Sequence, residues 1–136
     1  MKILIINGPN LNLLGTREPE IYGNIRMETV LSELQNRYNH EILYYQSNIE
    51  GELINRIQEE DYDALIINPG AFTHYSYAIA DALANLKKPK IEVHISHIYK
   101  REAFRQKSVT APYTDGIISG FGVKGYHLAV QNLVEG

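Results

Sequence analysis

Short apolar runs that alternate with segments of helical periodicity limit the folds open to this chain more than any other feature. The first run, residues 3–6, is continuous and mostly β-branched, which is typical of a parallel strand buried on both faces. After a long connection, Met27, Val30 and Leu34 recur at the spacing of one helix face. The same patterns predict strands at residues 3–6, 41–46, 63–67, 90–95 and 116–119. They predict helices at residues 25–38, 52–59, 73–86 and 123–134, with a further short helix within residues 96–105.

Strand and helix therefore alternate five times along the chain. This alternation is typical of an α/β fold, in which a parallel sheet carries helices on both faces. Since crossover connections are right-handed, five strands favour the flavodoxin-like strand order 2-1-3-4-5. We expect one domain over residues 1–136, because 136 residues are the size of one domain and no repeat, linker or low-complexity segment interrupts the pattern.

Composition excludes several classes of function. A net charge of −3 leaves no basic surface of the kind that nucleic acid requires. The absence of cysteine excludes disulfides, a thiol nucleophile and a cysteine-ligated metal. The first apolar run is too short for a signal peptide or a membrane span. We therefore expect a cytoplasmic protein that binds neither nucleic acid nor membrane.

Ligands of such sheets bind beyond the carboxyl ends of the strands, at the point where the strand order reverses. This rule predicts that residues 7–22, 68–74 and 94–96 converge on one ligand site. Side chains capable of chemistry are concentrated in and beside these segments: Asn10, Arg17, Tyr22, Asn68, His74, Glu92, His94 and Ser96.

Each of these residues also has a purely structural interpretation. Asn68 could form the turn with the proline and glycine that follow it, and His74 could cap a helix or lie on the surface. Glu92 and His94 share one side of a strand, either as a structural pair or as a catalytic one. His74, His94 and His97 could form a metal site, although no HxH or HExxH spacing supports one.

The connection of residues 7–23 is longer than the roughly two to six residues usual in α/β units. It contains leucines that can pack and two prolines that restrict the backbone, so its composition is not that of a disordered segment. Gly15 and Gly23 flank Arg17 and Tyr22 and could act as hinges. We interpret the segment as a lid that brings Arg17 and Tyr22 over the site. The alternative is a surface loop whose tyrosine packs and whose arginine is solvated.

The chemistry available to these residues is acid–base chemistry. The sequence contains neither a GxSxG nucleophile motif nor a phosphate-binding P-loop. A tyrosine has a pKa of about 10, but a nearby arginine lowers the pKa of an acid by about 1–3 units, so Arg17 could make Tyr22 a base. His94, oriented by Glu92, would protonate a departing group. These roles predict proton abstraction next to a carbonyl, followed by loss of water.

Six sequence blocks follow one another across nearly the whole chain. The first is NGPNL followed by LGTREPEIYG in residues 7–23. The others are QSN with EGEL at 46–53, NPGA with TH at 68–74, EVHIS at 92–96, RE with FR at 101–105 and GFG with GY at 120–126. In this order and spacing they resemble the blocks of type II 3-dehydroquinate dehydratases. The resemblance implies reversible dehydration of 3-dehydroquinate to 3-dehydroshikimate, in the shikimate route to aromatic amino acids, without cofactor or metal.

The resemblance also implies roles for individual residues. Tyr22 matches the base that removes a C2 proton, and Arg17 matches the residue that activates it and gates the lid. His94 matches the acid that protonates the C1 hydroxyl, and Asn10 matches a residue that helps to hold the enolate through water. The other matched positions bind the substrate: Asn68, Ile95 and Ser96 its carboxylate, His74 and Arg105 its ring hydroxyls, and Asp81 from a neighbouring subunit.

The resemblance further implies a homo-oligomer, a dodecamer of four trimers. One position departs from the family, which commonly has asparagine after Ser96 where this chain has His97. That histidine could alter the hydrogen bonds of the turn, place a second imidazole near the site, or lie on the surface.

The alternative function is a non-catalytic flavodoxin-like binding or signalling module. A phospho-receiver of that kind would need acids where Asn7 and Asn68 stand, and a flavin binder would need a Ser/Thr-rich loop after the first strand.

Overall fold

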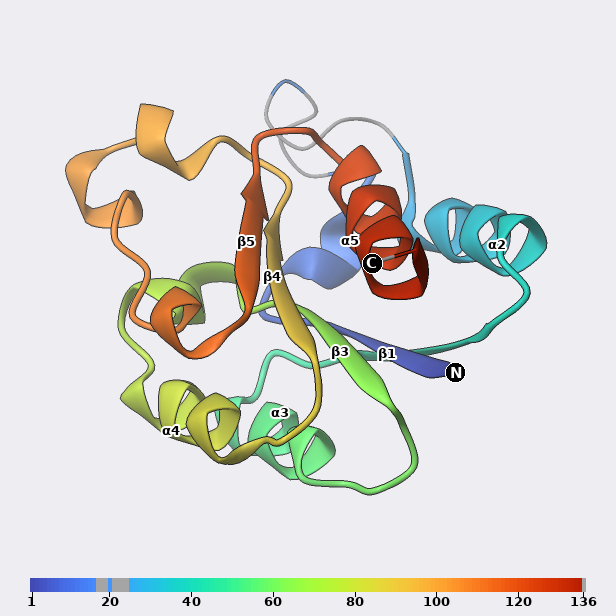
Figure 1. The fold of residues 1–136 in the computed structure, drawn as a ribbon. Coiled ribbons are helices and arrows are strands. Elements are labelled where there is room, and N and C mark those ends of the chain that lie inside the picture. Colours follow the sequence, from blue (N-terminus) through green and yellow to red (C-terminus); the bar gives the residue numbers. More distant parts are fainter. Residues whose placement is uncertain (17–19, 21–24, 136) are drawn as a thin grey trace.

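Five parallel strands form the sheet in the computed structural model, which describes residues 1–16, 20 and 25–135 (Figure 1). The strands are β1 (Lys2–Asn7), β2 (Glu41–Gln46), β3 (Ala64–Asn68), β4 (Lys90–His94) and β5 (Gly116–Ser119). They lie in the order β2-β1-β3-β4-β5, and each neighbouring pair is parallel. The flavodoxin-like order predicted from the sequence is confirmed.

Helices cover both faces of this sheet (Figure 1). One apolar core joins α2 (Met27–Arg37) and α5 (Lys124–Glu135) to the first face. A second core joins α3 (Glu50–Ile57) and α4 (Tyr77–Asn85) to the opposite face. None of the helices in the described residues combines the length and the hydropathy that a bilayer span requires.

The central strand β1 contributes to both cores, as its continuous apolar run predicts. Ile3 and Ile5 belong to the core under α2 and α5, whereas Leu4 and Ile6 belong to the core under α3 and α4. All four side chains have no exposed surface. Because successive side chains of a strand point to opposite faces, such burial requires apolar residues at consecutive positions.

Several element boundaries differ from the sequence-based predictions by one or two residues, and the start of α4 differs by more. The helix predicted over residues 73–86 begins at Tyr77, because the Ser76 hydroxyl accepts a hydrogen bond from the N–H of Ile79 and caps the helix there. The preceding residues Gly70–His74 form a separate 3-10 turn. α3 begins two residues earlier than predicted, at Glu50. The short helix predicted within residues 96–105 consists of two 3-10 turns, Ile98–Lys100 and Ala103–Arg105.

Strand register brings polar residues to one edge of the sheet. Asn7, the last residue of β1, pairs with Gln46 of β2 and Asn68 of β3. His94, the last residue of β4, pairs with Ser119 of β5. The carboxyl ends of the strands therefore present side chains with hydrogen-bonding groups at the edge where such folds bind ligands.

The backbone segments that follow β1 and β3 lie in close contact with each other. The N–H of Gly8 donates to the carbonyl oxygen of Asn68 at 2.8 Å. A Cβ atom placed on Gly8 would lie 2.3 Å from the carbonyl oxygen of Pro69. Only glycine fits this approach, so Gly8 fixes the relative position of the two segments that follow these strands.

Candidate active site

A cleft opens beyond the carboxyl ends of β1, β3 and β4. Its walls come from the residues that follow these strands and from the turns Ile98–Lys100 and Ala103–Arg105. The segments that the strand order predicts to converge meet here in the described part of the chain. Seven of the residues proposed from the sequence line the cleft: Asn10, Asn68, His74, His94, Ile95, Ser96 and Arg105.

Glu92 and His94 form a buried pair on β4. Nε2 of His94 lies 2.7 Å from Oε2 of Glu92. Glu92 has no exposed surface, and only 4% of His94 is exposed. His94 lines the cleft whereas Glu92 does not, so the imidazole stands between the carboxylate and any ligand. The carboxylate therefore fixes the orientation of the ring at the wall of the cleft.

Hydroxyl groups complete the surroundings of the Glu92 carboxylate. Oε2 accepts hydrogen bonds from Oγ1 of Thr73 at 3.0 Å and from Oγ of Ser108 at 2.8 Å. Oε1 accepts one from Oγ1 of Thr110 at 2.5 Å. Burial raises the pKa of Glu92, but the hydrogen bonds from His94 and these hydroxyls outweigh that effect and hold the pKa below its ordinary value. The carboxylate is therefore charged at neutral pH.

Two buried amides and a buried tyrosine lie beneath the cleft. Oδ1 of Asn68 accepts from the N–H of Gly70 at 3.1 Å, and Nδ2 of Asn68 donates to the hydroxyl of Tyr126 at 3.1 Å. That hydroxyl donates to Oδ1 of Asn7 at 2.7 Å, and Nδ2 of Asn7 donates to the hydroxyl of Tyr44 at 3.2 Å. Asn68 thus forms the turn with Gly70, as its structural interpretation predicts, and it also lines the cleft, where its role in binding stays a prediction.

Two arginines give the cleft a positive wall. Nη1 of Arg101 lies 3.4 Å from Oγ of Ser96, and Nε of Arg105 lies 3.3 Å from Oε2 of Glu102. Both arginine side chains line the cleft, and no carboxylate is among the described residues that do so. Guanidinium groups bind carboxylates and phosphates in preference to neutral ligands, so the cleft favours an anion.

His74 occupies another wall, at the end of the turn Gly70–His74. Its Nδ1 lies 2.7 Å from the backbone oxygen of Lys107. A carbonyl oxygen only accepts, so Nδ1 carries the proton, and Nε2 has no hydrogen bond to any described residue. The capping interpretation is wrong, because Ser76 caps the helix that follows.

Asn10 lies at the mouth of the cleft in an unusual backbone conformation. Its φ is 68°, in the left-handed region, which asparagine adopts more readily than other residues with a side chain. Its N–H donates to Oδ1 of Asn48 at 2.9 Å. This contact holds the backbone of Asn10, whereas its exposed side chain does not cap the following turn Leu11–Leu13.

Besides Glu92, two described residues that were discussed from the sequence, Asp81 and His97, do not line the cleft. Asp81 is exposed on α4 and does not line it, which leaves its inferred role dependent on a neighbouring subunit. His97 is exposed and stacks edge-on to Tyr99, with 6.2 Å between the ring centroids. Arg17 and Tyr22 lie outside the described residues.

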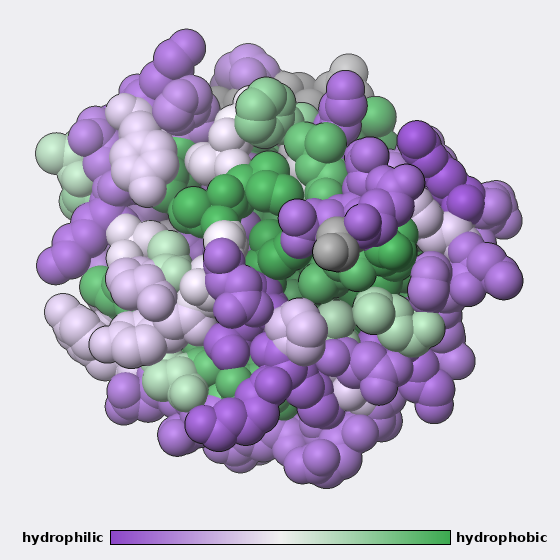
Figure 2. Space-filling model, in the orientation of Figure 1, coloured by the Kyte–Doolittle hydropathy of each residue, from purple (hydrophilic) through white to green (hydrophobic). Residues whose placement is uncertain are grey.

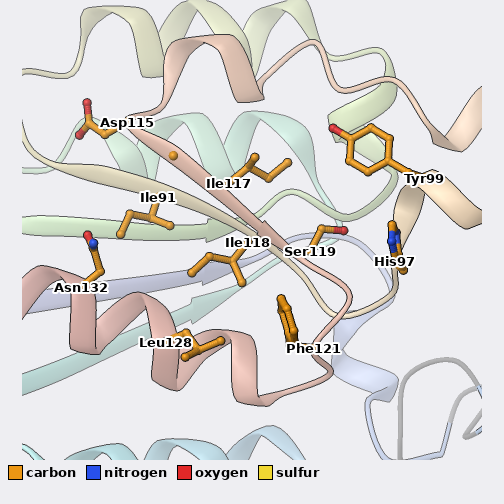
Figure 3. Close-up of a pocket in the computed structure, with 11 residues that line it drawn as sticks. Ile91, His97, Tyr99, Asp115, Ile117, Ile118, Ser119, Phe121, Leu128 and Asn132 are labelled. Atoms are coloured by element: carbon orange, nitrogen blue, oxygen red, sulfur yellow. The ribbon is translucent and has the colours of Figure 1, made fainter.

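A second hollow, of about 610 Å³, lies at the β5 edge of the sheet (Figure 3). Its floor is apolar, with Ile118 and Leu128 from β5 and α5, and apolar surface gathers in the middle of this face (Figure 2). His97, Tyr99 and Asp115 line it as well. All three are exposed, so this hollow lacks the buried acid–imidazole pair that marks the cleft.

The histidines do not form the metal site that was considered as an alternative. Within the part of the chain that the structure describes, no three histidines or carboxylates are grouped so that they could hold a metal ion. His74 and His94 line the cleft without a third ligand beside them, and His97 lies at the second hollow.

Fold and cleft together define a class of protein: a flavodoxin-like α/β enzyme with a cleft at the strand exits that contains a buried Glu–His pair and two arginines. Comparison with known proteins agrees with this class. The family model described as "Dehydroquinase class II" matches residues 1–134. This chain belongs to the class II dehydroquinases.

Relatives with assigned names cover nearly the full chain. A protein of Lachnoclostridium phytofermentans named 3-dehydroquinate dehydratase is 56% identical, over 99% of this chain and 97% of its own length. One of Thermotoga petrophila with the same name is 54% identical, over 96% and 93% of the two chains. The crystal structure of type II dehydroquinase from Butyrivibrio crossotus superimposes with a TM-score of 0.94 at 52% identity, covering 98% of this chain and 97% of that one.

Proposed function

We propose that this chain catalyses the reversible elimination of water from 3-dehydroquinate, giving 3-dehydroshikimate through an enolate. One observation carries the proposal: a chain of this family places a buried Glu92–His94 pair at a cleft with two guanidinium groups. The substrate is a carboxylate with ring hydroxyls, and the positive wall suits such an anion. The acid–imidazole pair suits a reaction that protonates a leaving hydroxyl.

His94 is the general acid of this mechanism. Glu92 holds Nε2 of the ring, so Nδ1 is the nitrogen that delivers a proton to the C1 hydroxyl, which leaves as water. The Glu92 carboxylate stays charged because its pKa is held low, and it compensates the charge of the imidazolium before transfer. In the reverse direction the neutral ring takes the proton back.

Tyr22 is the base that removes the C2 proton, and Arg17 lowers the pKa of its phenol. Both assignments rest on the family resemblance, since the two residues lie outside the described chain. Asn10 lies at the mouth of the cleft, which supports its assignment to the enolate through a bound water. The order of events is proton removal, enolate formation and loss of the hydroxyl.

The remaining residues bind substrate. Asn68, Ile95 and Ser96 bind the carboxylate, with Ser96 and an adjoining backbone amide as donors. His74 and Arg105 bind the ring hydroxyls. The clustering of all five in the cleft supports these assignments.

The assembly and the location of the enzyme belong to the same proposal. We propose a dodecamer of four trimers in which Asp81 reaches the site of a neighbouring subunit, and the exposure of Asp81 on α4 is consistent with such a contact. We propose a cytoplasmic location and no nucleic-acid or membrane partner. Light scattering tests the mass of the assembly, and cell fractionation tests the location.

The decisive experiment adds 3-dehydroquinate to the purified protein and follows the ultraviolet absorbance of the conjugated enone product. Separate reactions contain a metal chelator or borohydride. We expect turnover that neither reagent reduces. Loss of activity with the chelator would indicate a metal, inactivation by borohydride with substrate would indicate an imine, and absence of turnover would refute the proposed function.

A further inference from the structure

Tyr126 lies directly beneath the proposed carboxylate site and takes no part in the mechanism described above. It belongs to α5, on the face of the helix that packs against the sheet, and none of its surface is exposed. Its hydroxyl nevertheless contacts two amides, Asn7 at the end of β1 and Asn68 at the end of β3. The hydroxyl oxygen of Tyr126 therefore connects α5, at the C-terminal end of the chain, to the carboxyl ends of β1 and β3.

The donor and acceptor groups of Gly70, Asn68 and Tyr126 determine the direction of each hydrogen bond in this network. The Gly70 N–H needs an acceptor, so Oδ1 of Asn68 faces Gly70 and Nδ2 faces Tyr126. Because Nδ2 can only donate, the Tyr126 oxygen accepts, and its single proton is given to Asn7. The network thus has one arrangement of its protons.

Two bonds fix the plane of the Asn68 amide. One uses its oxygen and the other uses one of its two N–H groups, which leaves the second N–H free of described partners on a side chain that lines the cleft. We infer that Tyr126 is a positioning residue, which aims this second N–H of Asn68 at an oxygen of the bound ligand. The inference deepens the proposed function, since it takes the substrate carboxylate as that ligand group.

The Tyr126 hydroxyl stays protonated, as a residue that holds Asn68 in one orientation requires. Burial raises the pKa of its hydroxyl far above the ordinary value, and the bonds from Asn68 and to Asn7 reverse only part of that effect. The hydroxyl therefore keeps its proton at any pH at which the enzyme works. Its donation to Asn7 does not switch with pH.

The test removes the Tyr126 hydroxyl in a Tyr126→Phe variant. We expect KM for 3-dehydroquinate to rise about tenfold, the factor for one hydrogen bond, with kcat changed less than threefold. Tyr62→Phe is the matched control, because Tyr62 is also buried and donates to a backbone carbonyl, that of Ile57, away from the cleft. The control should lose stability and keep its KM.

A double-mutant cycle with Asn68→Ala then shows whether Tyr126 acts through Asn68. In the Asn68→Ala background, Tyr126→Phe should raise KM no further. An unchanged KM in the single variant, or an additive rise in the double variant, would overturn the inference. If wild-type protein does not turn over 3-dehydroquinate, the proposed function fails instead.

A crystal structure of the wild-type protein with 3-dehydroshikimate decides the matter if the variant does not fold. Nδ2 of Asn68 should lie within hydrogen-bond distance of both the Tyr126 hydroxyl and an oxygen of the ligand. A complex in which Nδ2 contacts only one of them contradicts the inference.

Discussion

His94 contacts Glu92 through Nε2, 2.7 Å from the carboxylate, at the wall of the cleft. The carboxylate lies behind the ring and accepts further bonds from Thr73, Ser108 and Thr110. The acid of the proposed mechanism is thus held by a charge that has no contact with solvent. The geometry of this pair leads to three experiments, and the proposed mechanism leads to two more, on Tyr22 and Arg17.

Replacing Glu92 by Gln removes the charge and keeps the shape. We expect kcat to fall about 100-fold, the lower range for acid–base catalysis, because the imidazolium of His94 is no longer stabilised. Substrate turnover followed by enone absorbance measures this effect. A variant with wild-type kcat would show that the pair is structural.

The same variant should alter the dependence of stability on pH. The pKa of Glu92 is lowered in the folded protein from 4.5, so its stabilising contribution is complete above pH 4.5 and is lost as pH falls through the folded-state pKa. Urea unfolding at pH 7 and at pH values below 4.5 measures it. The difference in unfolding free energy between wild type and Glu92→Gln should shrink in acid, and a constant difference would contradict the lowered pKa. Protonation of the exposed carboxylates affects the unfolding free energy of both proteins equally, so its contribution cancels in this difference.

His94→Ala should block loss of water and leave proton removal in place. We expect kcat for dehydration to fall by about 10²- to 10⁴-fold, while exchange of the C2 proton with deuterated solvent continues. Proton NMR of the substrate in D₂O reports both processes. If exchange and dehydration fall together, His94 is not the acid of a separate second step.

Tyr22→Phe should abolish nearly all turnover and preserve the fold, because it removes only the ionisable oxygen. Circular dichroism checks the fold, and the absorbance assay measures turnover. C2 exchange should stop in this variant, in contrast to His94→Ala. Retained activity would exclude the phenol as the base.

Arg17→Ala should lose most activity and move the rise of kcat/KM to higher pH, since a phenol without the guanidinium ionises only near its ordinary pKa of about 10. The measurement is a pH–rate profile from neutral to alkaline pH. A normal rate with an unaltered profile would remove the argument for activation of the tyrosine.

Much of the fold was predictable because β1 and β3 are uninterrupted apolar runs, a pattern that buried parallel strands require. The meeting of Asn10, Asn68 and His94 was predictable from the strand order alone. The predicted start of α4 at residue 73 is wrong: the alanines that favour this helix, at positions 78, 80, 82 and 84, all follow Ser76, and the hydroxyl of Ser76 marks the boundary.

Other parts of the site had no local signal. Ser108 and Thr110 lie in a stretch without predicted secondary structure, and they reach Glu92 only because the chain folds back over β4. Tyr126 fits an apolar helix face, and its hydroxyl contact with Asn7 spans 119 positions of the sequence. The one available hint was Glu92 inside a predicted strand of the sheet, since a buried carboxylate requires hydrogen-bond partners from other parts of the chain.

Asn10 keeps a left-handed backbone, a conformation in which glycine has no steric cost and asparagine has some. A glycine would suit the main chain better, yet it would delete the amide at the mouth of the cleft. The position therefore represents a trade-off between ease of folding and a polar group beside the ligand. Substitutions chosen to stabilise the protein by relieving backbone strain should therefore leave Asn10 unchanged.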